Sequence, residues 1–264
     1  MSDPGLLDLT GRVALVTGAG QGVGAETARY LARHGASVVV NDYVAGRAEA
    51  VADAIVADGA AAVAAPGDVS DGGDVERMAA AAKAAFGTID VLVNNAGNAG
   101  ASPAGLTSKP FWEKDPAEWE PFLRVNLYGV LHCCRAVIPG MIDAGRGGRI
   151  ITVISEAGRM GEPGLEAYSA AKAGAAGLTR ALARGLGQFG ITANNVAIAA
   201  TRTPATAAML ENDDFAKRVL RHYIIRRFGE PGDVAAAITF LASGASGWIT
   251  GQTYPVNGGF SVTL

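Results

Sequence analysis

Short apolar runs alternate with helical patterns along most of the chain. Residues 12–17, 36–40, 89–93, 149–155, 191–198 and 252–256 form such runs, and one more ends at residues 68–69. Their length and their glycine, asparagine or aspartate ends are typical of buried strands. Strands that alternate with helices predict an α/β fold, in which helices cover both faces of a doubly wound, seven-stranded parallel sheet.

Helical spacing of apolar residues is clear after the first run, at Ala25, Ala28, Leu31 and Ala32. Longer helical patterns cover residues 46–58, 71–86, 110–140 and 168–189. No linker, internal repeat or low-complexity tail interrupts the alternation. We therefore expect a single domain over residues 1–264, in which dinucleotide binding and catalysis share one unit.

Composition narrows the function classes. The chain is 49% hydrophobic, with 36 glycines among its 264 residues, and it has no run of eighteen apolar residues. A net charge of −3 and a pI of about 5.7 do not indicate the excess of basic residues that binding to nucleic acid or an anionic membrane requires. Cys133 and Cys134 are adjacent, which suggests neither a disulfide framework nor a metal site. We expect a soluble, cytoplasmic protein without metal.

A glycine-rich loop separates the first strand from the first helix. The loop contains Gly18, Gly22 and Gly24, with Gln21 and Val23 between them. Glycines let backbone N–H groups approach a pyrophosphate at a helix N-terminus, so this loop is a candidate phosphate site. A purely structural turn is the alternative.

Asp42 ends the second strand, eighteen residues after Gly24. A carboxylate near this spacing accepts hydrogen bonds from the ribose hydroxyls of a dinucleotide. The same charge repels a 2′-phosphate, which favours NAD over NADP. Arg47 is the nearby cation that would pair with that phosphate, although a solvated helix charge is its more ordinary role.

Ser155, Tyr168 and Lys172 form the candidate reaction centre. Tyr168 and Lys172 are four residues apart, so a helix would place them on one face, where the cation favours the phenolate. Ser155 ends a strand, and open α/β sheets bind ligands at the carboxyl ends of their strands. Ordinary packing with a solvated charge is the alternative for the spacing alone.

Taken together, these motifs resemble the short-chain dehydrogenase/reductase family in its single-domain form, whose sheet is of the Rossmann type. The resemblance spans residues 8–262 and rests on matching positions in the family's order: Thr17, Gly18, Gly22, Gly24, Asp68, Asn94, Asn95, Ala96, Gly97, Asn126, Ser155, Tyr168, Lys172, Asn257, Gly258 and Gly259.

The resemblance implies catalytic roles for four residues. Tyr168 is expected to exchange a proton with the substrate oxygen, and Ser155 to hydrogen-bond that oxygen. Lys172 is expected to hold the nicotinamide ribose and to lower the pKa of Tyr168. Asn126 is expected to anchor a water relay to Lys172; satisfying backbone groups at an irregular point of its helix is the alternative.

Cofactor contacts are implied by the same resemblance. Asp68 and Val69 would bracket the adenine, and Asn95, Ala96 and Gly97 would lie beside the adenosine ribose. Tyr168 and Lys172 would contact the nicotinamide ribose. Thr201 and Thr203 would contact the nicotinamide carboxamide.

One departure from the family pattern concerns that last contact. Ile198 and Ala199 stand where the family has proline and glycine. Proline fixes φ and glycine permits conformations that other residues avoid, so the sequence alone does not determine the backbone path of this loop.

The expected activity is NAD-dependent interconversion of a hydrophobic secondary alcohol and its ketone. The first alternative is a 3-hydroxyacyl thioester of coenzyme A or acyl carrier protein, because Glu156 and residues 157–164 are similar to family members that act on alicyclic hydroxyacyl-CoA. A non-catalytic NAD(H) sensor and a lyase or epimerase with transient hydride transfer are further alternatives.

Substrate choice is assigned to residues 204–227, which resemble the family's substrate loop and helix. Its arginines are candidates for an anion contact, with a solvated basic face as the alternative: Arg218, Arg221, Arg226 and Arg227. Residues 161–165 and 103–119 would form the other pocket walls. The long helical patterns predict self-association to a dimer or tetramer.

Overall fold

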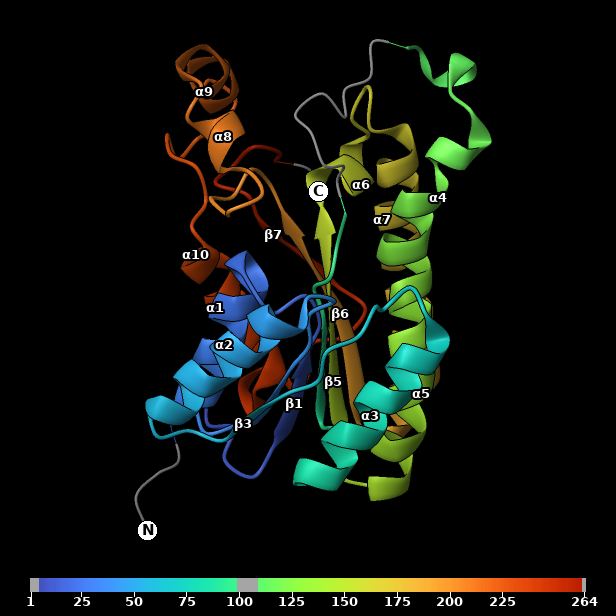
Figure 1. Cartoon of the computed structure of the whole chain (residues 1–264), viewed down its shortest axis with the longest axis vertical. Coiled ribbons are helices and arrows are strands. Elements are labelled where there is room, and N and C mark those ends of the chain that lie inside the picture. The colour runs from blue at the N-terminus through green and yellow to red at the C-terminus, as the bar shows by residue number, and fades with distance from the viewer. Residues whose placement is uncertain (1–4, 99–108, 263–264) are drawn as a thin grey trace.

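The computed structural model describes residues 5–98 and 109–262 (Figure 1). In this part of the chain seven strands form one parallel sheet, in the order β3-β2-β1-β4-β5-β6-β7. The strands are β1 Val13–Val16, β2 Ser37–Val40, β3 Ala62–Ala64, β4 Val91–Asn94, β5 Gly148–Ser155, β6 Ile191–Ile198 and β7 Thr253–Val256. The doubly wound, Rossmann-type sheet predicted from the sequence is confirmed.

Helices cover both faces of this sheet (Figure 1). One face carries α1 Gly22–Arg33, α2 Ala45–Ala57 and α10 Pro231–Ala242. The other carries α3 Gly72–Phe86, α5 Gly129–Ala144 and α7 Glu166–Leu186. Alternate strand residues serve the two cores: Ala14 and Val16 pack under the first layer, Val13 and Leu15 under the second.

Shorter elements gather beyond the carboxyl ends of the strands. They are η2 Phe111–Glu113, η3 Pro116–Glu118, α4 Glu120–Leu123, α6 Glu156–Met160, α8 Ala207–Leu210 and α9 Asp213–Leu220. In Figure 1, α8 and α9 project above the sheet on one side, and α4 and α6 lie on the other. The remaining short helices are η5 Gly187–Phe189 and η6 Gly244–Ser246.

Two predicted elements are wrong in extent. The third strand ends at Ala64, and Asp68 and Val69 lie in the loop that follows it. The pattern over residues 110–140 is not one helix, because two 3₁₀ turns precede α4 and a π-helical turn, η4 Arg124–Tyr128, joins α4 to α5. Pro116 and Pro121 restrict where a regular helix can begin.

Among the described residues, the helical stretch Pro116–Ala144 is long and apolar enough to cross a membrane by length and composition alone, with a mean hydropathy of 1.3 over an 18-residue window. Cys133, Cys134 and Val137 of this stretch belong to the second core, and its neighbours are α3 and α7. This packing is that of a helix that covers a sheet.

Candidate active site

A cleft of about 640 Å³ opens at the carboxyl edge of the sheet, where strand order reverses between β1 and β4. Every residue predicted to bind cofactor lines this one cleft: Gly18, Gln21, Gly22, Val23, Gly24, Asp42, Asp68, Val69, Asn95, Ala96, Gly97, Tyr168, Lys172, Thr201 and Thr203. The chain thus brings together residues that are up to 185 positions apart.

The glycine loop packs so closely on its neighbours that side chains at two of its glycines would collide with the backbone. A Cβ on Gly18, whose φ is +61°, would lie 2.8 Å from Ala96 Cα, and one on Gly24 would collide with the Gly18 carbonyl. No side chain of the described residues caps the N-terminus of α1, so its first N–H groups face the cleft without a partner of that kind. This cradle fits the pyrophosphate of a dinucleotide.

Two asparagines hold the loop in place. Asn95 donates through Nδ2 to Thr17 O at 2.9 Å and to Gly18 O at 3.1 Å. Asn41 Oδ1 accepts from Gly18 N at 3.4 Å, while its Nδ2 donates to Ala65 O at 3.0 Å. The sequence analysis missed this role of Asn41, because its partners come from separate loops that only the folded sheet brings together.

Asp42 lies at the end of the cleft beside the glycine loop and is only 3% exposed. Its carboxylate accepts from Gly20 N at 3.1 Å and from Val44 N at 2.9 Å, so the charge is fixed against the glycine loop. Arg47, which also lines the cleft, lies over the Tyr43 ring at 5.8 Å. The two opposite charges considered from the sequence therefore share one end of the cleft.

Ser155 and Tyr168 meet at the other end. Ser155 is the last residue of β5, and its Oγ accepts from Ala157 N at 3.2 Å, which caps α6. A hydrogen bond joins its side chain to that of Tyr168, on α7. Burial raises the pKa of Tyr168 above its ordinary value, and this hydrogen bond opposes the rise only in part.

Lys172 lies deeper than expected. Its Nζ donates to Val153 O at 2.9 Å and lies 5.9 Å from the centre of the Tyr168 ring. Burial lowers the pKa of Lys172 from 10.5 to about 8. The expected lowering of the Tyr168 pKa by Lys172 is therefore wrong for this structure, because burial raises the pKa and the group that opposes the rise is Ser155.

Asn126 is fully buried in the π-helical turn and stands behind the cleft. Its Oδ1 accepts from Asn98 N at 3.2 Å, and its Nδ2 donates to Asn98 O at 2.7 Å and Phe122 O at 2.9 Å. A Cβ on Gly97 would lie 3.2 Å from Asn126 Oδ1 and 3.3 Å from Lys172 Nζ. The backbone-satisfying alternative is thus observed, and Asn126 is a close neighbour of Lys172.

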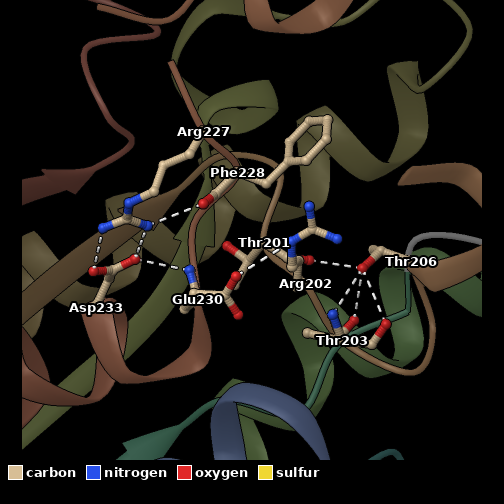
Figure 2. A network of polar contacts seen from close by, with 8 residues as sticks. All are labelled: Thr201, Arg202, Thr203, Thr206, Arg227, Phe228, Glu230 and Asp233. Carbon is tan, nitrogen blue, oxygen red and sulfur yellow. Dashed lines mark hydrogen bonds and ion pairs between the residues drawn. The ribbon is translucent and has the colours of Figure 1, made fainter. Parts of the chain in front are cut away.

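Thr201 and Thr203 lie in the loop after β6, held by a residue that the sequence analysis missed. Thr206 Oγ1 donates to Thr201 O at 2.6 Å and accepts from Thr203 N at 3.0 Å, as Figure 2 shows. Thr201 Oγ1 donates to Ala199 O at 3.0 Å. A threonine three residues after another is the local signal that would have suggested this turn.

The cations predicted to meet a substrate anion are partly engaged within the chain. Arg227 pairs with Asp233 at 2.6 Å, and Arg226 Nη1 donates to Leu220 O and Arg221 O at 3.1 Å each (Figure 2 shows the first pair). This favours the structural alternative for Arg226 and Arg227.

Lys114 connects the two predicted pocket walls, residues 103–119, to which it belongs, and residues 161–165. Its Nζ donates to Gly164 O and Glu166 Oε2, each at 3.1 Å. Residues 103–108 of the predicted wall lie outside the described residues. Glu156 is 3% exposed and turns away from the cleft, to Arg159 at 2.7 Å and to Ser261.

Comparison with known proteins agrees with this geometry. A family model described as enoyl-(acyl carrier protein) reductase matches residues 18–261. The 3-oxoacyl-(acyl-carrier-protein) reductase FabG of Staphylococcus epidermidis is 40% identical, over 93% of this chain and 97% of its own length. The BbsD subunit of a hydroxy(phenyl)methylsuccinyl-CoA dehydrogenase of Thauera aromatica is 38% identical, over 97% of this chain and 99% of its own.

Among solved structures, a gluconate 5-dehydrogenase from Burkholderia cenocepacia in complex with NADP and tartrate superposes with a TM-score of 0.90. It is 32% identical, and the match covers 99% of each chain. Fold, cleft and sequence matches agree, and the chain belongs to the short-chain dehydrogenase/reductase family, as an oxidoreductase that acts on CH–OH groups.

Proposed function

We propose that the protein is an NAD(H)-dependent oxidoreductase of 3-oxoacyl and 3-hydroxyacyl thioesters, carried on coenzyme A or acyl carrier protein. The observation that carries the proposal is the meeting of Ser155 and Tyr168 at the end of the cleft, in a chain 38–40% identical to enzymes named for such thioesters. The same names favour the thioester over the free hydrophobic alcohol that the sequence analysis placed first.

The nicotinamide ring, when bound, supplies or accepts the hydride. The chain handles the proton. In the reducing direction Tyr168 donates its phenolic proton to the carbonyl oxygen, and the Ser155 hydroxyl hydrogen-bonds the same oxygen as charge develops on it. Lys172 and Asn126 sit behind this pair, and Lys172 would hold the nicotinamide ribose.

NAD is proposed over NADP because of Asp42. Two backbone N–H groups fix its carboxylate, so it cannot swing aside from a 2′-phosphate. Arg47 is the competing influence, and its guanidinium lies over the Tyr43 ring at 5.8 Å. We further propose a soluble, cytoplasmic protein that self-associates to a dimer or tetramer.

The test is an absorbance assay at 340 nm with NADH or NADPH and three ketone classes: 3-oxoacyl-CoA esters, 3-oxoacyl esters of acyl carrier protein, and free cyclic ketones. We expect thioester turnover, with kcat/KM about tenfold or more higher with NADH than with NADPH. Asp42→Asn should reduce the ratio of kcat/KM with NADH to kcat/KM with NADPH, because it raises the value with NADPH. Turnover of free ketones without thioester turnover would refute the substrate proposal, and preference for NADPH in the unaltered protein would refute the cofactor proposal.

A further inference from the structure

Where β6 meets the loop after it, the chain has Ile198 and Ala199 in place of the family's proline and glycine. Ile198 is the last residue of β6 and pairs with Ser155 on one side and Val256 on the other. No residue between Ile198 and Thr203 has a left-handed φ. The backbone is therefore unstrained, but no pyrrolidine ring limits the conformations of the loop.

Packing from behind does not hold the loop either. A cavity of about 340 Å³ lies on that side, and Ala199, Ala200, Tyr223, Gly258 and Gly259 are among the residues that line it. Methyl groups that face a cavity gain few van der Waals contacts. The position of residues 199–203 therefore depends on polar contacts.

Tyr223 provides one of these contacts from a distant segment. Its hydroxyl accepts from Ala200 N at 2.8 Å, and Ala200 O accepts from Gly229 N at 3.0 Å, so both backbone polar groups of Ala200 are bonded. This hydroxyl is the acceptor that the structure gives to the Ala200 N–H. Without it, that N–H would lose its partner beside the cavity.

The Tyr223 ring is itself held firmly. It is 3% exposed, and its centroid lies 5.3 Å from that of Phe260 and 6.5 Å from that of Phe228. A Cβ on Gly258, whose φ is +59°, would come within 3.1 Å of the ring, so glycine at this position allows the tyrosine ring to pack here. A buried, packed ring presents its hydroxyl at a fixed point.

The loop that receives this hydrogen bond leads to the nicotinamide end of the cleft. Thr201 and Thr203 line the cleft there, and the Thr206 hydroxyl is hydrogen-bonded to both of them (Figure 2). Ala200 thus stands between two anchors, the last strand residues and the Thr206 turn. In the middle of the loop, Tyr223 binds Ala200 N, beside the backbone pairing of Ala200 O and Arg202 N with Gly229.

We propose that the Tyr223 hydroxyl is a positioning group for the nicotinamide half of the cofactor, and that it replaces the restraint that proline and glycine give in the family. The inference rests on the proposed nicotinamide cofactor. It assigns Tyr223 no contact with the reacting atoms, because its effect passes through Ala200 to Thr201 and Thr203.

This position in the fold predicts a selective effect. The ADP-ribose half of a dinucleotide would meet the glycine loop, Asp42 and Val69, whereas the hydrogen bond and ring contacts of Tyr223 are made with Ala200, Phe228 and Phe260. Loss of the hydroxyl should weaken binding of NADH and leave ADP-ribose, which lacks nicotinamide, unaffected. A general loss of structure would weaken both ligands.

The experiment compares Tyr223→Phe with Tyr30→Phe by titration calorimetry with NADH and with ADP-ribose. Tyr30 lies in the C-terminal half of α1, so the control also loses one tyrosine hydroxyl. We expect the Kd for NADH to rise about 5- to 20-fold in Tyr223→Phe, as for a buried N–H left without its partner. All other Kd values should stay within about twofold of the unaltered protein.

A second arm restores the family residues. In a chain carrying Ile198→Pro and Ala199→Gly, we expect Tyr223→Phe to raise the Kd for NADH by less than about twofold. A double-mutant cycle compares this effect with that of Tyr223→Phe alone, and the difference measures the coupling between Tyr223 and the two loop positions. This arm also serves if Tyr223→Phe alone does not fold.

Three results overturn the inference: equal loss of NADH and ADP-ribose affinity, no loss of either, or an undiminished loss in the chain with proline and glycine. If the unaltered protein binds ADP-ribose but neither NADH nor NADPH, the proposed function fails and the inference falls with it. This failure can be told apart from the other three results, because those results can be measured only if the unaltered protein binds NADH.

Discussion

Burial decides what Tyr168 can do beside Ser155. Its raised pKa keeps the phenol neutral at physiological pH, which is the form that donates a proton to a ketone. Oxidation of an alcohol needs the phenolate instead. On the proposed function, we therefore expect ketone reduction to proceed near neutral pH, and alcohol oxidation to accelerate as the pH rises toward the pKa of Tyr168.

Removal of this phenolic proton is the most direct test at the residue scale. Tyr168→Phe should lower kcat for ketone reduction by about 10²- to 10⁴-fold, the usual contribution of a positioned acid. The Kd for NADH, measured by fluorescence titration, should change little. Tyr254→Phe, in β7 and away from the cleft, should keep full turnover. A Tyr168→Phe enzyme with more than a tenth of the original kcat would assign the proton to another group.

Lys172 makes a prediction for stability. Its pKa is about 8 in the folded protein and about 10.5 when unfolded, so below pH 8 the buried charge costs about 3 kcal/mol. Between pH 8 and 10.5 the unfolded state binds more protons, so stability rises with pH. Lys172→Met should be about 1–2 kcal/mol more stable at pH 7, after loss of the hydrogen bond to Val153 O.

Urea unfolding at several pH values checks this prediction. The advantage of Lys172→Met should shrink steadily from pH 8 to pH 10, while its turnover is lost at every pH. A difference in unfolding free energy that stays constant over this range would mean that Lys172 keeps its ordinary pKa.

At this scale, the residues that lie in motifs were predicted from the sequence. Ser155, Tyr168 and Lys172 are recognisable because their spacing carries the chemistry. Asn41 and Thr206 were missed, because an asparagine or threonine gains its role from carbonyl and N–H groups that distant segments bring to it. The sign of the pKa shift of Tyr168 was wrong because it depends on burial, which spacing alone does not determine.

At the scale of elements, the glycine loop and α1 act as one rigid unit. Gly24 is in the first turn of α1 and packs against the Gly18 carbonyl and the Asn95 amide. Gly24→Ala should lower the unfolding free energy by about 1–3 kcal/mol, because the backbone cannot move aside for the methyl group. It should also weaken NADH binding, since the loop must shift.

The matched control is Gly185→Ala in α7. Nothing lies within 4 Å of a Cβ at that helical position, so the substitution should stabilise the protein by up to about 1 kcal/mol. Thermal and urea unfolding of both variants give the comparison. Equal effects of the two substitutions would contradict the packing of the glycine loop.

Elements with a strong local pattern were predicted best. The sixth strand was predicted at residues 191–198, and β6 has these bounds, because the segment follows a glycine, begins and ends with isoleucine and is buried on both faces. The π-helical turn could not be predicted, since the hydrogen bonds of Asn126 to Asn98 that accompany it join segments 28 residues apart. The third strand was extended too far because Ala65 and Val69 are buried without being paired.

At the scale of the whole molecule, the helix that runs from α4 through η4 into α5 packs on α7 beside the sheet. Part of its surface remains apolar and exposed, with Tyr128 at 43% and Leu131 at 39%. Such surfaces on neighbouring long helices suit the isologous contact of a two-fold dimer. Because η4 carries Asn126, this contact would also steady the helix behind Lys172.

The proposed self-association can be tested at Leu131. A guanidinium at the centre of an apolar contact would be buried without a partner, so Leu131→Arg should reduce the mass found by size-exclusion chromatography with light scattering by about half or more. Val56→Arg is the matched control, because Val56 is 52% exposed on α2, on the opposite face of the sheet. The control should keep the mass of the unaltered protein, a dimer or tetramer. Equal masses for all three proteins would exclude Leu131 from the interface, and a monomeric unaltered protein would refute self-association itself.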